Sequence, residues 1–400
     1  MKSVPDTSGK TATAVRSATA EAVPTHGRRR HGLAVALSLY TLLRAINFAT
    51  LAIAANIQHE DLRGLLLAFD ATWYADIAVN GYDDVVKADS NGLLKQSNLA
   101  FFPLYPALTA AVKSTLHVDV GAALLMVANV AAFAAAAALY AIGSHIRSPR
   151  TGILLAALWA VTPHAMVQSM GYSESVFTAL AAYGLFALLR RQWLTAGILT
   201  LLAGLTRPTA AALIATVVLV ALLAVWRKPV LWRAWAAILL APLGLVGFMT
   251  WVAVRLGRID GYFYAQSQAW NMSFDGGFYT VRFFVYSFVR SSFLGGSAPF
   301  EYAEVSLVLA AASLLLFAAV RARVPWPLLL YAAICLIVAF TGAGFYWSKA
   351  RMLVPAFPLL LPLVFWSERS RLRIVLVITL LTVMSAFLTV YLSLHWKHSF

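Results

Sequence analysis

The sequence predicts an all-α, polytopic membrane protein, a bundle of about 11 transmembrane helices. Of its 400 residues, 61% are hydrophobic and only 12% are charged. Several apolar runs reach the roughly 20 residues that a helix needs to cross a bilayer. The stretches between these runs are too short for a separate globular domain. Together these observations exclude an ordinary soluble protein.

The charge pattern argues against a nucleic-acid partner. The net charge is +15, but the basic residues fall in short connectors and in the N-terminal tail rather than on one soluble face. This distribution is typical of membrane orientation. The single cysteine, Cys335, lies in an apolar run and has no second cysteine with which to form a disulfide.

Two units are predicted along the chain. Residues 1–31 are rich in Ala, Thr and Ser and carry scattered basic residues, so we expect a disordered cytoplasmic tail that is attracted to anionic lipids. Residues 32–400 are expected to form one multi-spanning membrane domain. Its spans are predicted at 33–56, 119–143, 151–168, 173–190, 193–206, 208–226, 232–254, 303–321, 325–342, 352–366 and 372–394.

The basic connectors set the predicted orientation. If the N-terminus is cytoplasmic, the connectors with paired basic residues, such as Arg190 with Arg191, all fall on the cytoplasmic side. Counting the apolar run 101–116 as a span would move them outside, so this run is predicted to lie along the membrane. Two extracytoplasmic segments then result, 57–118 and 255–302. We expect a multi-pass plasma-membrane protein whose chemistry takes place in these segments.

The first outer segment begins with a predicted amphipathic helix that ends at Gly81. Asp70 and Tyr74 lie one turn apart on its flank. A short helix of this kind, with a carboxylate beside aromatic rings, suits an enzyme that acts on a lipid-linked polar substrate at the membrane surface. The apolar residues of the helix recur every three or four positions: Leu62, Leu66, Phe69, Trp73 and Ile77.

Two motifs in this segment resemble a known family. The run FDATWYADIAVNGY (69–82) is followed by LAFFPLYP (99–106). They are similar to the signatures WD-x-x-(W/Y)-Y-x-x-I-A-x-x-G-Y and A-F-F-P-x-x-P of the PIG-V-like family, the GPI mannosyltransferase 2 group and its bacterial relatives. The chain departs from the first signature at Phe69, where the family usually has Trp. Phe keeps the packing but loses an indole N–H that could bond a sugar.

The resemblance implies a type C glycosyltransferase. Such an enzyme would move one hexose, mannose by analogy, from a polyprenyl-phosphate donor to a lipid or glycan acceptor on the extracytoplasmic side, with inversion at the anomeric carbon. Membrane lipids would surround it. In these enzymes an acid in the first outer loop acts as the base, and Asp70 is the matching residue here. Judged by position alone, Asp70 is equally well explained as a helix-surface or capping carboxylate.

Later motifs supply further candidates. GYSESVF (171–177) resembles the family's Y-S-E-S motif and contains Glu174, although an acid at a helix start is also favoured by the helix dipole. Arg207, in LTRPTA, matches an R-P pair. A guanidinium at membrane depth is costly unless paired, so we expect it to meet the donor phosphate, with an acid such as Glu174 as the alternative partner. Arg351 and Lys349 precede a P-x-x-P run and could share that phosphate, with snorkelling as the alternative for Lys349.

Aromatic and amide side chains complete the predicted substrate contacts. Tyr74 and Tyr82 could line a wall for a sugar or an isoprenoid chain, although aromatic residues also anchor proteins at membrane interfaces. Gln266 and Trp270, in the second outer segment, resemble a loosely spaced A-Q-x-x-x-W element. Arg44 is a charge inside the first span, and its partner is not evident from the sequence.

No required metal or cofactor is expected. The acids Asp83, Asp84 and Asp89 have no histidine at a ligand spacing, so a solvated turn explains them better, and a divalent metal stays the alternative. Two other functions remain open. A transporter or lipid flippase would also be polytopic but should show two similar halves, which the sequence lacks. A non-catalytic subunit of a glycosylation complex would tolerate Asp70→Asn.

Overall fold

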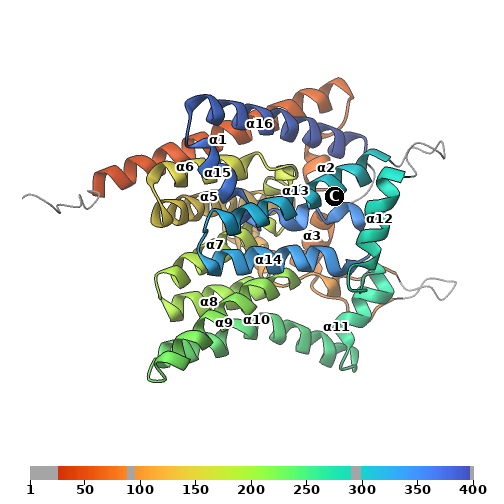
Figure 1. Cartoon of the computed structure of the whole chain (residues 1–400). Coiled ribbons are helices and arrows are strands. Elements are labelled where there is room, and N and C mark those ends of the chain that lie inside the picture. Colours follow the sequence, from red (N-terminus) through yellow and green to blue (C-terminus); the bar gives the residue numbers. More distant parts are fainter. Residues whose placement is uncertain (1–25, 88–94, 290–298, 397–400) are drawn as a thin grey trace, which may run out of the picture.

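The computed structural model describes residues 26–87, 95–289 and 299–396 and is almost entirely helical, as Figure 1 shows. Across these ranges, six helices are long and apolar enough to cross a membrane, and a bent pair raises the number to seven if it counts as one span. The predicted all-α, multi-pass membrane class is therefore confirmed. The six spans lie in α1 (His26–Ile57), α5 (Val120–Ile146), η3 with α9 (Pro208–Ala210 and Ala211–Arg227), α10 (Trp232–Leu256), α13 (Pro299–Arg321) and α16 (Arg371–Leu394).

The remaining elements are shorter. Three of them, α7 (Glu174–Leu189), α8 (Trp193–Gly204) and α14 (Trp326–Thr341), are apolar helices of 10–17 residues. The two strands β1 (Ser273–Phe274) and β2 (Gly342–Ala343) pair antiparallel. The other elements are α2 (Leu62–Leu66), α3 (Asp70–Asn80), η1 (Asn98–Ala100), α4 (Leu104–Leu116), α6 (Pro149–Ala160), η2 (Ala165–Gln168), α11 (Gly261–Tyr264), η4 (Ala265–Ala269), α12 (Phe278–Val289), η5 (Tyr346–Ser348), η6 (Arg351–Leu353), η7 (Phe357–Leu360) and α15 (Leu361–Ser367).

The number of full-length spans is smaller than predicted, because several apolar runs are broken. The run 151–168 is helical only as far as Ala160 and then turns through Pro163 into η2. The run 352–366 contains a bend of 72° between Tyr346–Leu353 and Phe357–Ser367. Pro355 and Pro358 lie at this bend, where they cannot donate the backbone hydrogen bonds of a continuous helix. Such breaks are tolerated where the freed backbone groups find other partners.

Arg44 supplies such partners at the end of α6. Its guanidinium donates to the carbonyl of Ala160 (3.4 Å) and to Oγ of Ser169 (2.7 Å). Next to it, the amide of Gln168 donates to the Trp159 carbonyl (2.8 Å). The intramembrane arginine therefore holds the connection between α6 and α7 in place.

The single helix predicted from Leu62 to Gly81 is divided in the structure into two helices, α2 and α3. Asp61 caps α2 by accepting from the N–H of Gly64 (2.9 Å), and Phe69 then adopts φ 57° and ψ −115° before α3 begins. The carbonyl of Leu66 accepts a hydrogen bond from the N–H of Gly171 (3.0 Å), which replaces the bond lost at the break. The helix end at Gly81 was predicted correctly.

The N-terminal tail was also predicted too long. Helix α1 begins at His26, so the last six residues of the predicted tail 1–31 are helical. The rest of that tail, residues 1–25, lies outside the described residues, as does Asp89.

Helices α8 and α10 pack closely through small residues. A Cβ at Gly244 of α10 would lie 1.9 Å from the Leu201 carbonyl oxygen of α8, and a Cβ at Gly197 would lie 2.9 Å from Cα of Ala237. Small side chains let helix backbones approach in this way in membrane proteins.

The long helices lie side by side, and the short helices α2, α3, α11 and α12 gather at one end of the bundle, on the right in Figure 1. These short helices belong to the two segments predicted as outer loops, 57–118 and 255–302. The helix predicted at 101–116 is α4, which begins at Leu104. The candidate site lies at this end.

Candidate active site

A cavity of about 1260 Å³ lies among the two loop segments and two helix connections. It is lined by residues of α3, of the connection before η3, of α11 and η4, and of the segment from Val338 to Met352. Asp70, Arg207 and Arg351 all line it. Three of the charged residues singled out in the sequence, each from a different part of the chain, therefore face one hollow.

Two carboxylates and two guanidinium groups form an ionic cluster at this cavity. Oδ2 of Asp70 lies 2.8 Å from Nη2 of Arg351, and Oε1 of Glu174 lies 3.7 Å from Nε of Arg351. Arg207 forms a second ion pair with Glu174. The Glu174 side chain is fully buried, whereas the side chains of Asp70 and Arg207 are 15% and 11% exposed. The cluster is balanced in charge, with Glu174 behind it and Asp70 at the cavity surface.

Each member of the cluster sits at an end of a helical element. Asp70 and Glu174 occupy the first turns of α3 and α7, where the helix dipole favours negative charge. Arg207 directly precedes η3, and Arg351 begins η6 with its guanidinium 5.2 Å from the Tyr172 ring centroid. Because the chain leaves its helices at these points, the charged side chains lie at helix ends rather than within uninterrupted spans.

Backbone contacts fix the connections that carry these residues. The N–H of Leu104, at the start of α4, donates to the Leu205 carbonyl (2.9 Å), two residues before Arg207. The connection before Glu174 touches α3 so closely that a Cβ at Gly171 would lie 2.8 Å from Cβ of Ala71. The first outer segment therefore packs against the connection that carries Arg207 and against the connection that carries Glu174.

Tyr74 lines the cavity as predicted but is not suited to act as a base. Its hydroxyl shares a 2.8 Å hydrogen bond with Oγ of Ser173, and its ring packs edge-on against Phe101 and Tyr105. Burial raises the pKa of Tyr74 above its ordinary value, although the charge of Arg207 partly opposes this. Tyr74 therefore keeps its proton at neutral pH. Asp70 is the cavity-facing carboxylate beside it.

An aromatic wall forms another side of the cavity. The Trp73 and Phe101 rings are stacked with centroids 5.9 Å apart, and Trp270 meets Trp73 edge-on at 5.3 Å. The indole N–H of Trp270 donates to the Ser97 carbonyl (3.0 Å), which fixes its ring. Phe345 adds a further ring 6.3 Å from Trp270. Flat aromatic faces of this kind can hold the apolar face of a sugar ring or a lipid chain.

The wall contains residues that sequence reasoning overlooked. Trp270 and Gln266 were predicted as substrate contacts and both line the cavity. The amide nitrogen of Gln266 donates to the Tyr262 hydroxyl (2.8 Å). Trp73 and Phe345 were not predicted as site residues. Trp73 was assigned to the apolar face of the helix, and its place one turn from Ile77 gave no signal for a cavity.

Three predicted substrate contacts lie outside the cavity lining. Glu174 is behind it, as described above. The Tyr82 hydroxyl donates to the Phe101 carbonyl (2.8 Å), and its ring packs against Trp251 at 5.0 Å. Lys349 was expected to share the phosphate, but its ammonium donates to the Ala339 carbonyl (2.7 Å) and to the carbonyl of Gly342. A buried ammonium needs such acceptors, and the end of α14 supplies them.

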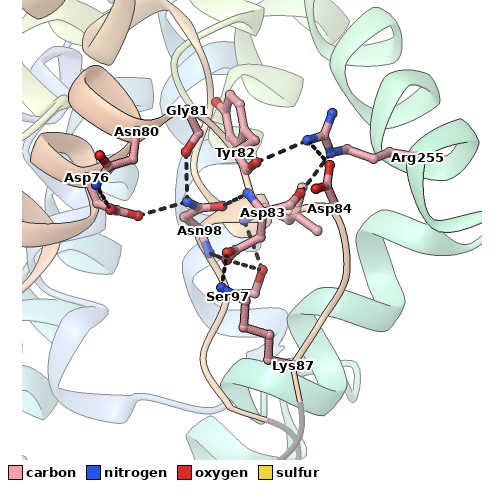
Figure 2. A network of polar contacts seen from close by, with 11 residues as sticks. Asp76, Asn80, Gly81, Tyr82, Asp83, Asp84, Lys87, Ser97, Asn98 and Arg255 are labelled. Carbon is pink, nitrogen blue, oxygen red and sulfur yellow. Dashed lines mark hydrogen bonds and ion pairs between the residues drawn. The ribbon is translucent and has the colours of Figure 1, made fainter.

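Three other acids of the first outer segment, Asp76, Asp83 and Asp84, belong to a separate network, shown in Figure 2. The side-chain amide of Asn98 donates to Oδ2 of Asp76 (3.0 Å) and to the Gly81 carbonyl (3.1 Å), and it accepts from the N–H of Asp83 (2.9 Å). Arg255, at the end of α10, donates to the Asp83 carbonyl and pairs with Asp84 at 2.6 Å. This network ties the loop after α3 to α10.

Within residues 26–87, 95–289 and 299–396, no three His, Cys, Asp or Glu side chains come together as ligands of a metal ion. The carboxylates of Asp83 and Asp84 point to different partners, since Asp83 pairs with Lys87 at 3.0 Å and Asp84 with Arg255.

The fold is similar to that of solved structures, one of which is described here. The chain resembles ArnT from Cupriavidus metallidurans in the apo state, at 16% sequence identity and a TM-score of 0.49. The match covers 88% of this chain and 62% of that chain, so this chain spans less than two thirds of its length. No family model and no curated protein matches the sequence.

Proposed function

We propose that this protein is a membrane glycosyltransferase of type C that uses a polyprenyl-phosphate sugar donor. One observation carries the proposal: a cavity-facing carboxylate, Asp70, lies 2.8 Å from the Arg351 guanidinium, and Arg207 and the aromatic wall line the same cavity. Glycosyl transfer from a phosphate-linked donor needs a base, positive charge and a shaped cleft. The cavity of about 1260 Å³ is large enough for a sugar and a lipid phosphate together.

In the proposed reaction an acceptor hydroxyl attacks the anomeric carbon of the donor sugar. The bond between this carbon and the phosphate oxygen breaks, and the lipid phosphate leaves with the electron pair. Asp70 takes the proton of the attacking hydroxyl. Attack on the face opposite the phosphate inverts the anomeric carbon.

The two arginines have distinct proposed tasks. Arg351 holds the Asp70 carboxylate in position by their ion pair at 2.8 Å. Arg207 faces the cavity and is the proposed contact of the leaving phosphate, while Glu174 keeps its guanidinium in place. Arg and phosphate form strong charge-assisted hydrogen bonds, and these gain strength as charge develops on the leaving oxygen.

The finer assignments come from the sequence resemblance. Mannose as the sugar, and a PIG-V-like specificity, are proposed from the motifs around Asp70, Glu174, Arg207 and Arg351. The acceptor is proposed to be a lipid or a glycan. The N-terminus is proposed to be cytoplasmic and the cavity extracytoplasmic, because the basic connectors then lie inside.

The proposal is tested with the purified full-length protein in lipid nanodiscs. Radiolabelled polyprenyl-phosphate mannose is added with a membrane lipid extract as acceptor, and labelled product and released lipid phosphate are both measured. We expect both to appear together. Movement of intact donor across a liposome membrane without product would instead indicate a transporter or flippase. If wild-type protein gives no product with any extract or glycan, the catalytic assignment is wrong and a non-catalytic subunit is favoured.

A further inference from the structure

A second cavity lies beside the segment that carries Arg351. It has a volume of about 470 Å³ and is lined almost wholly by apolar side chains of α13, of α16 and of the segment from Ala350 to Leu360. It shares no lining residue with the first cavity. Leu307 of α13 and Phe387 of α16 line it and are 60% and 54% exposed, so it opens on the outer surface of the bundle. In a membrane protein that surface faces lipid.

Two polar side chains stand at one end of this apolar space. Glu304, on α13, is buried, with only 8% of its surface exposed. Its Oε1 lies 3.7 Å from Nδ1 of His164, which is also buried. In the part of the chain that the structure describes, the two carboxylate oxygens of Glu304 have no hydrogen-bond partner, and the same is true of Nδ1 of His164. Both residues line the cavity. Buried polar groups without partners are rare because leaving them unpaired is costly.

The lining residues of the cavity extend along α13. At its polar end the Phe300 ring lies one turn from Glu304 and bridges to α16, with ring centroids 5.9 Å from Phe387 and 4.8 Å from Tyr391. From Glu304 the cavity follows α13 as far as Leu315. At about 1.5 Å per residue, this is a length of roughly 16 Å.

We propose that this cavity binds a long-chain alcohol, with its hydroxyl within hydrogen-bond distance of both Glu304 and His164 and its chain along α13. A hydroxyl both donates and accepts, so one group can satisfy the carboxyl oxygen and the imidazole nitrogen. A phosphate or carboxylate head would meet the Glu304 carboxyl group, which disfavours an anion. An ammonium head would bury a charge in an apolar space, which is costly even when it is paired. The proposal does not depend on the glycosyltransferase assignment, because it uses none of the residues of the first cavity.

The test uses the full-length protein in nanodiscs and a dodecanol that carries a photoreactive diazirine on its chain. After irradiation, labelled peptides are located by mass spectrometry. Dodecan-1-ol, dodecane, dodecylamine and dodecyl phosphate are compared as competitors. We expect label on cavity residues such as Leu307 and Met384, and we expect dodecan-1-ol to displace it best.

Two variants on α13 provide a matched comparison. Ala311→Trp places an indole in the cavity and is expected to lower the labelling about tenfold, a loss of roughly 1.4 kcal/mol in binding. Leu314→Trp places the same side chain on the exposed surface of the helix and is expected to leave the labelling unchanged. Glu304→Leu, which replaces the unpaired acid by an apolar side chain, should abolish the preference for the alcohol over dodecane.

The proposal is overturned if the label spreads evenly over the exposed residues of α13 and is equally reduced, or equally unaffected, in the two tryptophan variants. It is also overturned if dodecyl phosphate or dodecylamine competes better than dodecan-1-ol with the wild-type protein.

Discussion

Asp70 and Asp76 lie on the same short helix, α3, but in very different surroundings. Asp76 accepts hydrogen bonds from two neighbouring amides, Asn80 (2.8 Å) and Asn98 (3.0 Å), in the network of Figure 2. Asp70 faces a cavity and pairs with Arg351, far along the chain. The acids of this helix therefore have different surroundings, since Asp76 is bonded to amides that hold the loop together and Asp70 is paired with an arginine at the cavity surface. Residue type alone does not separate them.

The two regions also differ in how their charges are satisfied. In the loop network, amides, backbone carbonyls and the half-buried Arg255 share the hydrogen bonds. In the cluster at the cavity, two acids and two guanidinium groups depend on one another. Removing one partner should therefore have larger effects in the cluster.

The largest effect on stability is expected at Arg207. Arg207→Gln leaves the fully buried Glu174 without its nearest ion pair, and loss of one partner of a buried pair costs about 3–5 kcal/mol of folding free energy. Combining it with Glu174→Gln should restore most of the lost folding free energy, because no uncompensated charge then remains. Thermal unfolding in nanodiscs measures both. A double variant no more stable than Arg207→Gln alone would show that the pair is not the source of the loss.

A smaller effect is expected in the loop network. Asn98→Ala removes one of the two amide donors to Asp76 and the partners of the Gly81 carbonyl and the Asp83 N–H, so we expect a loss of about 1–3 kcal/mol. Asn129→Ala is the matched control, since that amide donates within its own helix, to the Leu125 carbonyl. Sugar transfer by the folded fraction should stay near the wild-type rate for both. A selective loss of transfer in Asn98→Ala would mean that the network belongs to the reaction site.

The smallest effect is expected at Asp119, which caps α5. A hydrogen bond from the Ala122 N–H, together with the nearby Arg63, lowers the pKa of Asp119 below its ordinary value of 3.8. Because the pKa is lowered in the folded state, the stabilisation is present above that ordinary value and is lost as the pH falls through the lowered one. Asp119→Asn should therefore lower the unfolding temperature slightly at neutral pH and less at about pH 3. An equal difference at both pH values would contradict this.

The sequence predicted the membrane class well because composition and run length report it directly. It could not show that α6 ends at Ala160 or that Phe69 interrupts the first loop helix. These breaks depend on partners far away in the chain, such as Arg44 for the Ala160 carbonyl and Gly171 for Leu66. The spacing of apolar residues at every third or fourth position continues through such a break, so it does not show where the helix ends.

The candidate site was predictable in part. An arginine between two apolar runs has to be paired, and Glu174 was one of the two partners considered for Arg207. The ion pair between Asp70 and Arg351 could not be read from the sequence, since nothing fixes the distance between α3 and η6. Lys349 was expected near the donor phosphate, but its ammonium donates to two carbonyls at the end of α14. The sequence does not reveal these local partners.

The most direct measurement compares Asp70→Asn with Asp76→Asn in a single turnover of bound donor, with donor affinity measured in the same nanodiscs. If Asp70 is the base, Asp70→Asn lowers the rate of transfer by about 10²–10⁴-fold while donor affinity changes little. Asp76→Asn, on the same helix, should transfer near the wild-type rate. Equal rates for Asp70→Asn and wild type, or an equal loss in both variants, would contradict the account.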